Sequence, residues 1–116
     1  MKAVVLHEYG GPEKLKFEDN VPEPLISGST VLIAAAAASI NPIDWKLRSG
    51  IRRKDSPLSF PAILGRDVSG IVRTVGANVK HFKAGDRVLA LSNATYAELV
   101  AVDDSDVTHQ IGRAHV

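Results

Sequence analysis

The sequence predicts a mainly β protein of one domain, folded as a barrel or a sandwich and interrupted by a short helix at about residues 42–49. Short apolar runs recur along the chain, separated by turns rich in glycine and proline. Only residues 41–50 combine a helix start signal with a stop signal. A length of 116 residues is sufficient for one domain with a buried core.

The first two strands are predicted as a hairpin. Residues 2–9 are rich in aliphatic and β-branched side chains and end at the Gly-Gly-Pro turn of residues 10–12. Residues 14–19 alternate Leu15 and Phe17 with charged residues, which is typical of a half-exposed strand. We therefore expect this second strand to pair back on the first.

An extended loop, a buried strand and the helix should follow in that order. Residues 21–29 contain two prolines and suit a loop, and residues 30–39 are apolar throughout. The five-alanine run is compatible with a helix, but "TVLI" opens it without an amphipathic stripe, so we favour a strand. Asn41 is suited to cap a helix, and Pro42 is suited to its first helical position. Gly50 is suited to end this helix.

The second half of the chain predicts a polar loop and three further strands. Residues 51–62 form the loop, and residues 77–86 connect the first two of these strands through a turn at 84–86. Gly70 lies inside a strand, which indicates a bulge or a close approach of two backbones. The predicted strands are 67–76, 87–92 and 95–102, the last two joined by a short turn at 93–94.

Composition excludes several classes of partner. The net charge is +1 and the basic residues are scattered among acids, so we expect neither nucleic acid nor a membrane as partner. The chain has no cysteine, which excludes disulfides and thiolate metal sites and is compatible with a reducing compartment. No apolar run reaches the ~20 residues that span a bilayer, and no signal-peptide core is present. We expect a cytoplasmic location.

Established catalytic and metal motifs do not occur. Ser69 lacks the flanking glycines of a nucleophile elbow, and no G-x-G-x-x-G follows a strand and opens a helix. We predict no metal site, because no histidine has metal-ligand spacing to a second ligand. The histidines are His7, His81, His109 and His115.

The helical segment at residues 41–50 is the one candidate site. Its polar and aromatic residues fit a plain structural interpretation, as a cap, a first-turn acid, a packing aromatic and a surface charge: Asn41, Asp44, Trp45 and Arg48. They also fit a functional one, because a helical interruption between a buried strand and a long loop is where barrels carry sites. The basic cluster 51–55 is either a solvated loop or an anion site.

Four segments resemble the N-terminal catalytic domain of medium-chain dehydrogenase/reductases, in the family's order and over residues 1–109. They are "AVVLHEYGGPEKLKFED", "INPIDWKLRSG", "FPAILGRDVSGIVRTVGANVKHFKAGDRVLAL" and "YAELVAV". The sequence is most similar to the zinc-independent quinone oxidoreductase branch. The resemblance implies a GroES-like, partly open β-barrel over residues 1–110.

The resemblance also implies that both zinc sites of the zinc-dependent relatives are missing. Asn41 stands where those relatives have a cysteine ligand, and Arg66 where they have a histidine ligand. The structural zinc lobe is absent, because the chain passes from Leu91 through four residues to Tyr96. Without zinc, the family's chemistry is NADPH-dependent hydride transfer to a quinone or an activated C=C bond of an enone.

Site residues follow from the same resemblance. Asn41 and Asp44 would be catalytic and would line the cofactor and substrate cleft, with Asn41 a hydrogen-bond donor near the nicotinamide. Asn41, Pro42 and Arg52 would bind the cofactor, with Arg52 attracting a phosphate unless its loop is simply solvated. Arg52 stands where many relatives carry a tyrosine that could donate a proton, which argues against a tyrosine-assisted enoyl-thioester mechanism.

The resemblance implies that this chain is part of a longer parent protein, with a Rossmann domain in cis after residue 110. That domain would hold most of the NADPH, and the parent would form a homodimer through it. Residues 111–116, "IGRAHV", resemble a translated sequencing adapter, so we expect a non-native tail, against the alternative of a genuine short terminus. We expect the chain to be inactive alone, with an exposed apolar face. The alternative is a stand-alone GroES-like barrel that acts as a protein-interaction module.

Overall fold

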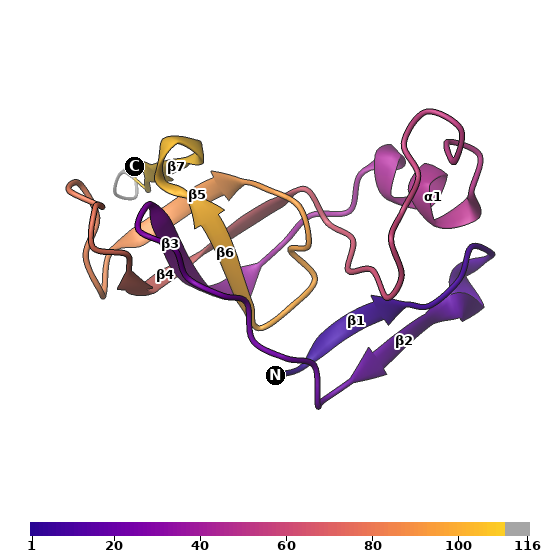
Figure 1. Ribbon diagram of the computed structural model, residues 1–116, viewed down its shortest axis with the longest axis horizontal. Helices are drawn as coiled ribbons and strands as arrows, with labels where there is room; N and C mark the ends of the chain where they lie inside the picture. The colour runs from indigo at the N-terminus through magenta and orange to yellow at the C-terminus, as the bar shows by residue number, and fades with distance from the viewer. Residues whose placement is uncertain (111–116) are drawn as a thin grey trace, which may run out of the picture.

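The computed structural model describes residues 1–110, and its β-strands dominate that part of the chain (Figure 1). A curled five-stranded sheet forms one end of the molecule, and a β-hairpin with the α-helix forms the other (Figure 1). The prediction about a non-native tail concerns residues outside the described ones. In chain order the strands and the α-helix are β1 Ala3–Leu6, β2 Leu15–Glu18, β3 Thr30–Ala37, α1 Pro42–Ser49, β4 Asp67–Val75, β5 Arg87–Leu91, β6 Leu99–Asp103 and β7 Val107–His109.

The five-stranded sheet has the order β6-β3-β4-β5-β7, and every neighbouring pair is antiparallel. One face carries the main hydrophobic core, because inward-facing residues alternate with exposed ones along β4 and β5. The sheet curls around this core, which makes it a partly open barrel, as predicted. The buried core residues are Val31, Ile33, Val68, Val72, Val88, Ala90, Val100 and Val102.

The apolar run at residues 30–39 is a strand, as predicted. Residues 30–37 form β3, which pairs with β6 on one side and with β4 on the other. The first four residues of β3 are buried. The β3–β4 register shifts next to Gly70, and a Cβ at Gly70 would lie 2.2 Å from the carbonyl oxygen of Ala34. The predicted close approach of two backbones at Gly70 is therefore confirmed.

Two strand predictions in the second half of the chain are wrong. The strand predicted at 95–102 begins only at Leu99, and β5 is separated from β6 by two strands, so no tight turn at 93–94 joins them. Residues 92–98 instead cross to β1, where the amide of Val4 donates to the carbonyl of Tyr96 at 2.9 Å. The sequence also gave no signal for β7, because three residues are too few to show alternation.

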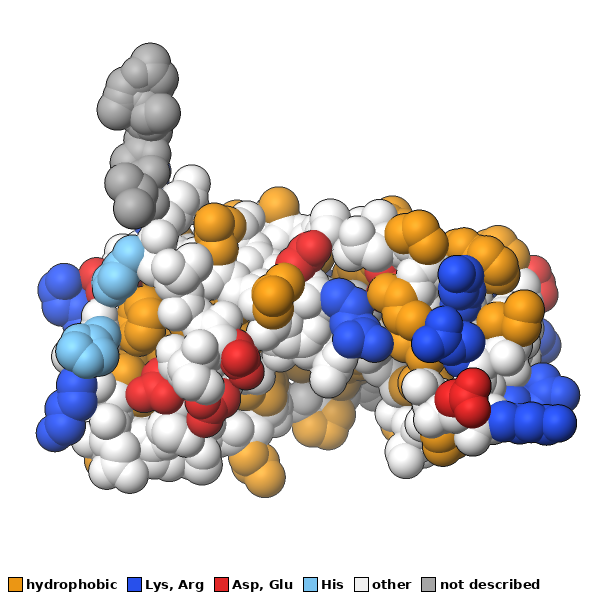
Figure 2. Space-filling view, turned by 90° about the horizontal axis from the view of Figure 1, so that it is seen from above, with side chains coloured by type: hydrophobic (Ala, Val, Ile, Leu, Met, Phe, Trp, Pro, Cys, Tyr) orange, Lys and Arg blue, Asp and Glu red, His pale blue; other side chains and the backbone are white. Residues whose placement is uncertain are grey.

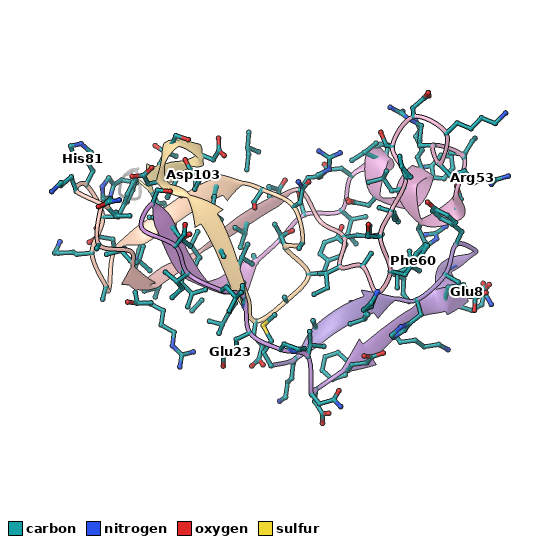
Figure 3. All side chains as sticks on the ribbon, in the orientation of Figure 1. Glu8, Glu23, Arg53, Phe60, His81 and Asp103 are labelled. Atoms are coloured by element: carbon teal, nitrogen blue, oxygen red, sulfur yellow. The ribbon has the colours of Figure 1, made fainter. Side chains whose placement is uncertain are left out.

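The predicted hairpin of the first two strands is confirmed, with Leu6 opposite Leu15. Leu6 is fully buried and forms a second small core with Leu47 of α1 and Leu64. The loop after α1 is held over this core, because the amide of Leu58 donates to the Tyr9 hydroxyl at 2.9 Å. Figure 3 labels Phe60, whose ring packs edge-on against Tyr9 with centroids 4.9 Å apart.

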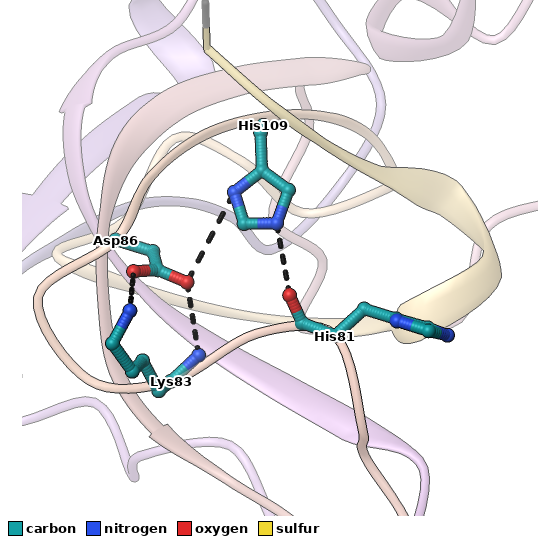
Figure 4. A network of polar contacts seen from close by, with 4 residues as sticks. All are labelled: His81, Lys83, Asp86 and His109. Atoms are coloured by element: carbon teal, nitrogen blue, oxygen red, sulfur yellow. Dashed lines mark hydrogen bonds and ion pairs between the residues drawn. The ribbon is translucent and has the colours of Figure 1, made fainter.

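A polar network closes the opposite end of the sheet (Figure 4). The ring of His109 lies 2.8 Å from the carbonyl oxygen of His81 and stacks on Phe82, with centroids 4.6 Å apart. Asp86 accepts from both the side chain and the amide of Lys83, at 3.0 and 3.1 Å. These contacts attach β7 to the loop before β5.

Asp86 should contribute to stability in a pH-dependent way. The hydrogen bonds from Lys83, the side-chain one first, lower the pKa of Asp86 below its ordinary value of 3.8. The folded pKa is thus below the unfolded one, so the stabilisation is present above the unfolded pKa and is lost as pH falls through the folded pKa. Urea midpoints of wild type and Asp86→Asn should differ at pH 7, and the difference should shrink as pH falls below 3.8. A difference that stays the same below that pH would contradict this origin.

Candidate active site

The helix α1 forms for the reasons that the sequence predicts, and its bounds agree with the prediction at 42–49. Asn41 precedes it in extended conformation, and Pro42 occupies the first helical position. Gly50 ends it with a positive φ of 86°, and its amide donates to the carbonyl of Leu47 at 3.3 Å. The helix therefore begins beside the end of β3 and is fixed at both termini.

Asp44 is the centre of the hydrogen-bond network at the start of α1. Its side chain is 5% exposed and accepts hydrogen bonds from three separate segments of the chain. The donors are the Asn41 amide at 2.8 Å, the Tyr96 hydroxyl at 2.9 Å and the Gly65 amide at 3.2 Å. Asp44 thereby ties the helix start to the segment before β4 and to the crossing segment 92–98.

Asn41 is the N-cap of α1, as predicted, and forms a capping box with Asp44. The bond that closes the first turn runs from the backbone amide of Asn41 to Asp44, and the Asn41 side chain faces the end of β3. Its Nδ2 lies 3.2 Å from the Ser39 hydroxyl and 3.5 Å from the carboxylate of Asp67. The amide group is therefore at the surface beside the first residue of β4.

Asp67 is held in place by Ser39. The amide of Ser39 donates to one carboxylate oxygen of Asp67 at 2.8 Å, and the hydroxyl of Ser39 donates to the other. These bonds, the hydroxyl one first, lower the pKa of Asp67 below its ordinary value of 3.8. A fixed negative charge therefore lies next to the Asn41 side chain.

Tyr96 completes the cluster. The sequence pattern placed this residue in a strand and did not predict its role at the site. Its hydroxyl also lies 3.1 Å from the carbonyl oxygen of Ser39. Burial, and then the hydrogen bond to Asp44, raise the pKa of Tyr96 to about 12. Tyr96 therefore stays protonated near neutral pH and serves as a donor to the carboxylate.

An apolar groove of about 720 Å³ adjoins this cluster, where β3 and β5 end and β4 and β7 begin. Leu91 is 72% exposed there, and hydrophobic side chains are visible on several parts of the surface in Figure 2. Ser39 and Asp67 belong to both the groove and the polar cluster. The residues that line the groove are Ala37, Ala38, Ser39, Asp67, Val68, Ser69, Leu89, Ala90, Leu91, Ser105, Asp106, Val107 and Thr108.

Of the predicted site residues, Asn41, Pro42 and Asp44 lie together at the start of α1. Arg52 is exposed in the turns that follow Gly50, beyond the other end of a helix about 12 Å long. The structure therefore does not bring Arg52 beside Asn41. Trp45 is 46% exposed, so it is not a packing residue of the core.

No group of three His, Cys, Asp or Glu side chains that could hold a metal ion occurs within residues 1–110. Arg66 is exposed, and its carbonyl accepts from the Ser92 amide at 2.9 Å. His7 pairs with Glu18 across the hairpin at 2.6 Å. In the same part of the chain, no helix is long and apolar enough to cross a membrane.

Thr95 is a buried residue next to the site, and its hydroxyl group makes no hydrogen bond to the described residues. Its side chain is 1% exposed, and its Oγ1 has no hydrogen-bond partner among residues 1–110. Gly65 packs directly over it, since a Cβ at Gly65 would lie 2.1 Å from this oxygen. A buried hydroxyl without a partner costs free energy that a methyl group of the same shape does not.

Thr95→Val should therefore raise the free energy of unfolding by about 1 kcal/mol. Thr95→Ser, which keeps the hydroxyl and removes the methyl group, should lower it by about 1 kcal/mol. Urea unfolding followed by far-UV circular dichroism measures both. If valine destabilised the protein as much as serine does, the hydroxyl would have a partner after all.

The fold and the site define a class of protein, a GroES-like partly open barrel with a capped helix whose N-cap residue contacts the wall of an apolar groove. Comparison with known families is consistent with this class: residues 27–112 match the alcohol dehydrogenase GroES-like domain. The chain belongs to this family.

Several similar proteins are oxidoreductases by name. The mitochondrial NAD(P)H oxidoreductase RTN4IP1 of Bos taurus is 40% identical over 95% of this chain and 32% of its own length. The chloroplastic NADPH-dependent alkenal/one oxidoreductase of Arabidopsis thaliana is 47% identical over 78% of this chain and 23% of its own. Among solved structures, Escherichia coli quinone oxidoreductase complexed with NADPH has a TM-score of 0.84 and 32% identity, over 94% of this chain and 33% of its own. This chain thus spans about a third or less of each of these relatives.

Proposed function

We propose that this chain is the catalytic domain of an NADPH-dependent, zinc-independent oxidoreductase that reduces quinones or activated C=C bonds by hydride transfer. The observation that carries the proposal is the Asn41 side-chain amide, which lies beside an apolar groove at the start of α1. The names of the similar proteins support it, because they include a quinone oxidoreductase and an alkenal/one oxidoreductase. Zinc independence rests on the family resemblance, which places Asn41 and Arg66 at the positions of metal ligands in zinc-dependent members.

The residues at the start of α1 fit one end of a nicotinamide cofactor. Asn41 and Ser39 offer an amide and a hydroxyl, groups that can pair with a carboxamide, and Pro42 adds an apolar surface. The chain has no glycine-rich turn for the pyrophosphate, so a Rossmann domain in cis would hold the remainder of the cofactor. When bound, the cofactor supplies the hydride. Arg52 as a phosphate ligand stays a prediction, because it lies beyond the far end of α1.

In this proposal the chain's own residues orient and polarise the reacting groups. Asn41 donates a hydrogen bond near the reaction centre, where a fixed donor stabilises developing negative charge. Asp44 contributes by holding the Asn41 backbone and the Tyr96 hydroxyl, so that the donor does not have to reorganise. The apolar walls of the groove exclude water from an acceptor bound there.

A cofactor titration of the 116-residue chain tests whether most of the NADPH contacts lie in the second domain. Because most cofactor contacts would lie in the second domain, we expect no binding of NADPH with a micromolar dissociation constant and no quinone turnover by the chain alone. Isothermal calorimetry and NADPH absorbance at 340 nm measure these two quantities. Micromolar binding would show that the chain holds the cofactor without a second domain.

The catalytic part of the proposal needs a complete enzyme. A chimaera would join residues 1–110 to the cofactor domain of Escherichia coli quinone oxidoreductase, and it should oxidise NADPH with a quinone or an enone as acceptor. Asn41→Ala in it should lower kcat by about 100-fold, with little change in NADPH affinity, because one preorganised donor is lost. Asp19→Asn, on an exposed loop, is the control. An unchanged kcat in Asn41→Ala would remove Asn41 from the catalytic role.

The location and the oligomeric state complete the proposal. We propose a cytoplasmic location for the parent, although one similar protein is mitochondrial by name. We also propose a homodimeric parent that associates through its second domain. Cell fractionation and size-exclusion chromatography of the whole parent protein test these two points, and a mitochondrial fraction or a monomer would contradict them.

A further inference from the structure

Within residues 1–110, the charged side chains that line the apolar groove all have the same sign. Among these described residues, the ionisable ones in the lining are Asp67 and Asp106, and the others are alanine, valine, leucine, serine and threonine. The volume of about 720 Å³ lies within the roughly 300–1,000 Å³ of small-molecule sites. An apolar surface of this size next to carboxylates, with no lysine or arginine among its described lining residues, complements an uncharged molecule and repels an anion.

Asp67 is a fixed charge in this groove. Both of its oxygens accept hydrogen bonds from Ser39, and Ser39 itself lines the groove. The carboxylate therefore cannot rotate away from a ligand without breaking these bonds. The lowered pKa of Asp67 keeps it ionised throughout the neutral range. A ligand that fills the apolar part of the groove thus lies close to a permanent negative charge.

We propose that this groove binds uncharged apolar small molecules and that Asp67 makes it discriminate against anionic ones. The inference rests on the proposed function, because it specifies the hydride acceptors as uncharged quinones or enones and not as carboxylates or sulfonates. Asp106, from the turn before β7, adds a second negative charge to the same walls. Asp67 is the main determinant because Ser39 holds it in one position.

A matched pair of aromatic ketones tests the discrimination on the 116-residue chain itself. Methyl 4-acetylbenzoate is uncharged, and 4-acetylbenzoate has nearly the same shape and carries one negative charge. Each is titrated into ¹⁵N-labelled protein at low salt, and the amides of Ser69, Leu89 and Val107 report on the groove. We expect the ester to shift these amides, and the carboxylate to bind at least threefold more weakly.

Asp67→Asn should reduce the ratio of the two dissociation constants at least threefold, because it strengthens carboxylate binding relative to ester binding. Asp19→Asn removes the same charge from an exposed position outside the groove and should leave the ratio unchanged. If Asp67→Asn does not fold, Asp106→Asn should shift the ratio in the same direction. Added salt should reduce the wild-type ratio.

Several outcomes would overturn the inference: equal binding of ester and carboxylate by wild type, the same ratio in the tested groove variant, an equal effect of Asp19→Asn, or no shift of the groove amides with either ligand. The measurement needs neither NADPH nor turnover. A chimaera without reductase activity would therefore refute the proposed function while leaving the charge discrimination intact. An active chimaera whose groove binds both ketones equally would do the reverse.

Discussion

Asp44→Ala should lower the free energy of unfolding by about 3 kcal/mol or more, because three hydrogen-bond donors would lose their acceptor at a site that is 5% exposed. The donors come from the start of α1, from Gly65 and from Tyr96, so the variant also releases three segments from one another. Urea unfolding followed by far-UV circular dichroism measures the effect. A variant that is unfolded without urea would satisfy the expectation.

Tyr96→Phe is the graded control for Asp44→Ala. It removes one of the three donors and leaves the carboxylate two others, so the expected loss is about 1 kcal/mol. If Asp44→Ala cost no more than Tyr96→Phe, the buried carboxylate would not be the residue that joins the segments.

Gly70→Ala should be about as damaging, at about 3 kcal/mol or more, because the added methyl group would meet backbone and not a movable side chain. Its Cβ would lie 2.2 Å from the carbonyl oxygen of Ala34, inside the central β3–β4 pair. Relief would require the two strands to separate, which would break their pairing. Thermal unfolding followed by circular dichroism should show a large fall in Tm.

Gly85→Ala separates lack of space from backbone conformation. Gly85 has a positive φ of 95° but no atom within 4 Å of an added Cβ. The variant should therefore cost only the strain of a left-handed residue, about 1–2 kcal/mol. An equal loss in Gly70→Ala and Gly85→Ala would mean that close packing at Gly70 is not what requires glycine.

The helix α1 is a feature that neighbouring residues in the sequence predict correctly. Asn41, Pro42 and Gly50 specify its bounds through short-range chemistry, and the structure agrees with the prediction. The same holds for β3, whose length and lack of an amphipathic stripe indicated a buried strand, and for Gly70, whose place inside a strand indicated close backbones. Each of these signals lies within a few residues of the feature that it predicts.

The path of residues 92–98 is a feature that local sequence patterns do not predict. The turn at 93–94 suggested adjacent strands, but β6 pairs with β3 and the segment between crosses to β1. Strand order depends on which apolar faces meet in three dimensions, and alternation within one strand carries no record of its partner. The role of Tyr96 escaped prediction for the same reason, since it meets Asp44 across 52 residues of chain.

The mainly β class, the limits of α1 and the candidate residues at its start could be predicted from the amino-acid sequence, because capping, turn chemistry and alternation act between near neighbours in the chain. Three features became visible only in the folded chain: Asp44 is a buried junction, Arg52 lies beyond the far end of the helix, and Ser39 fixes Asp67 beside an apolar groove. Most of these contacts form where β3, β4 and the crossing segment meet. Residues that are far apart in the sequence can form such a site only when folding brings them into contact.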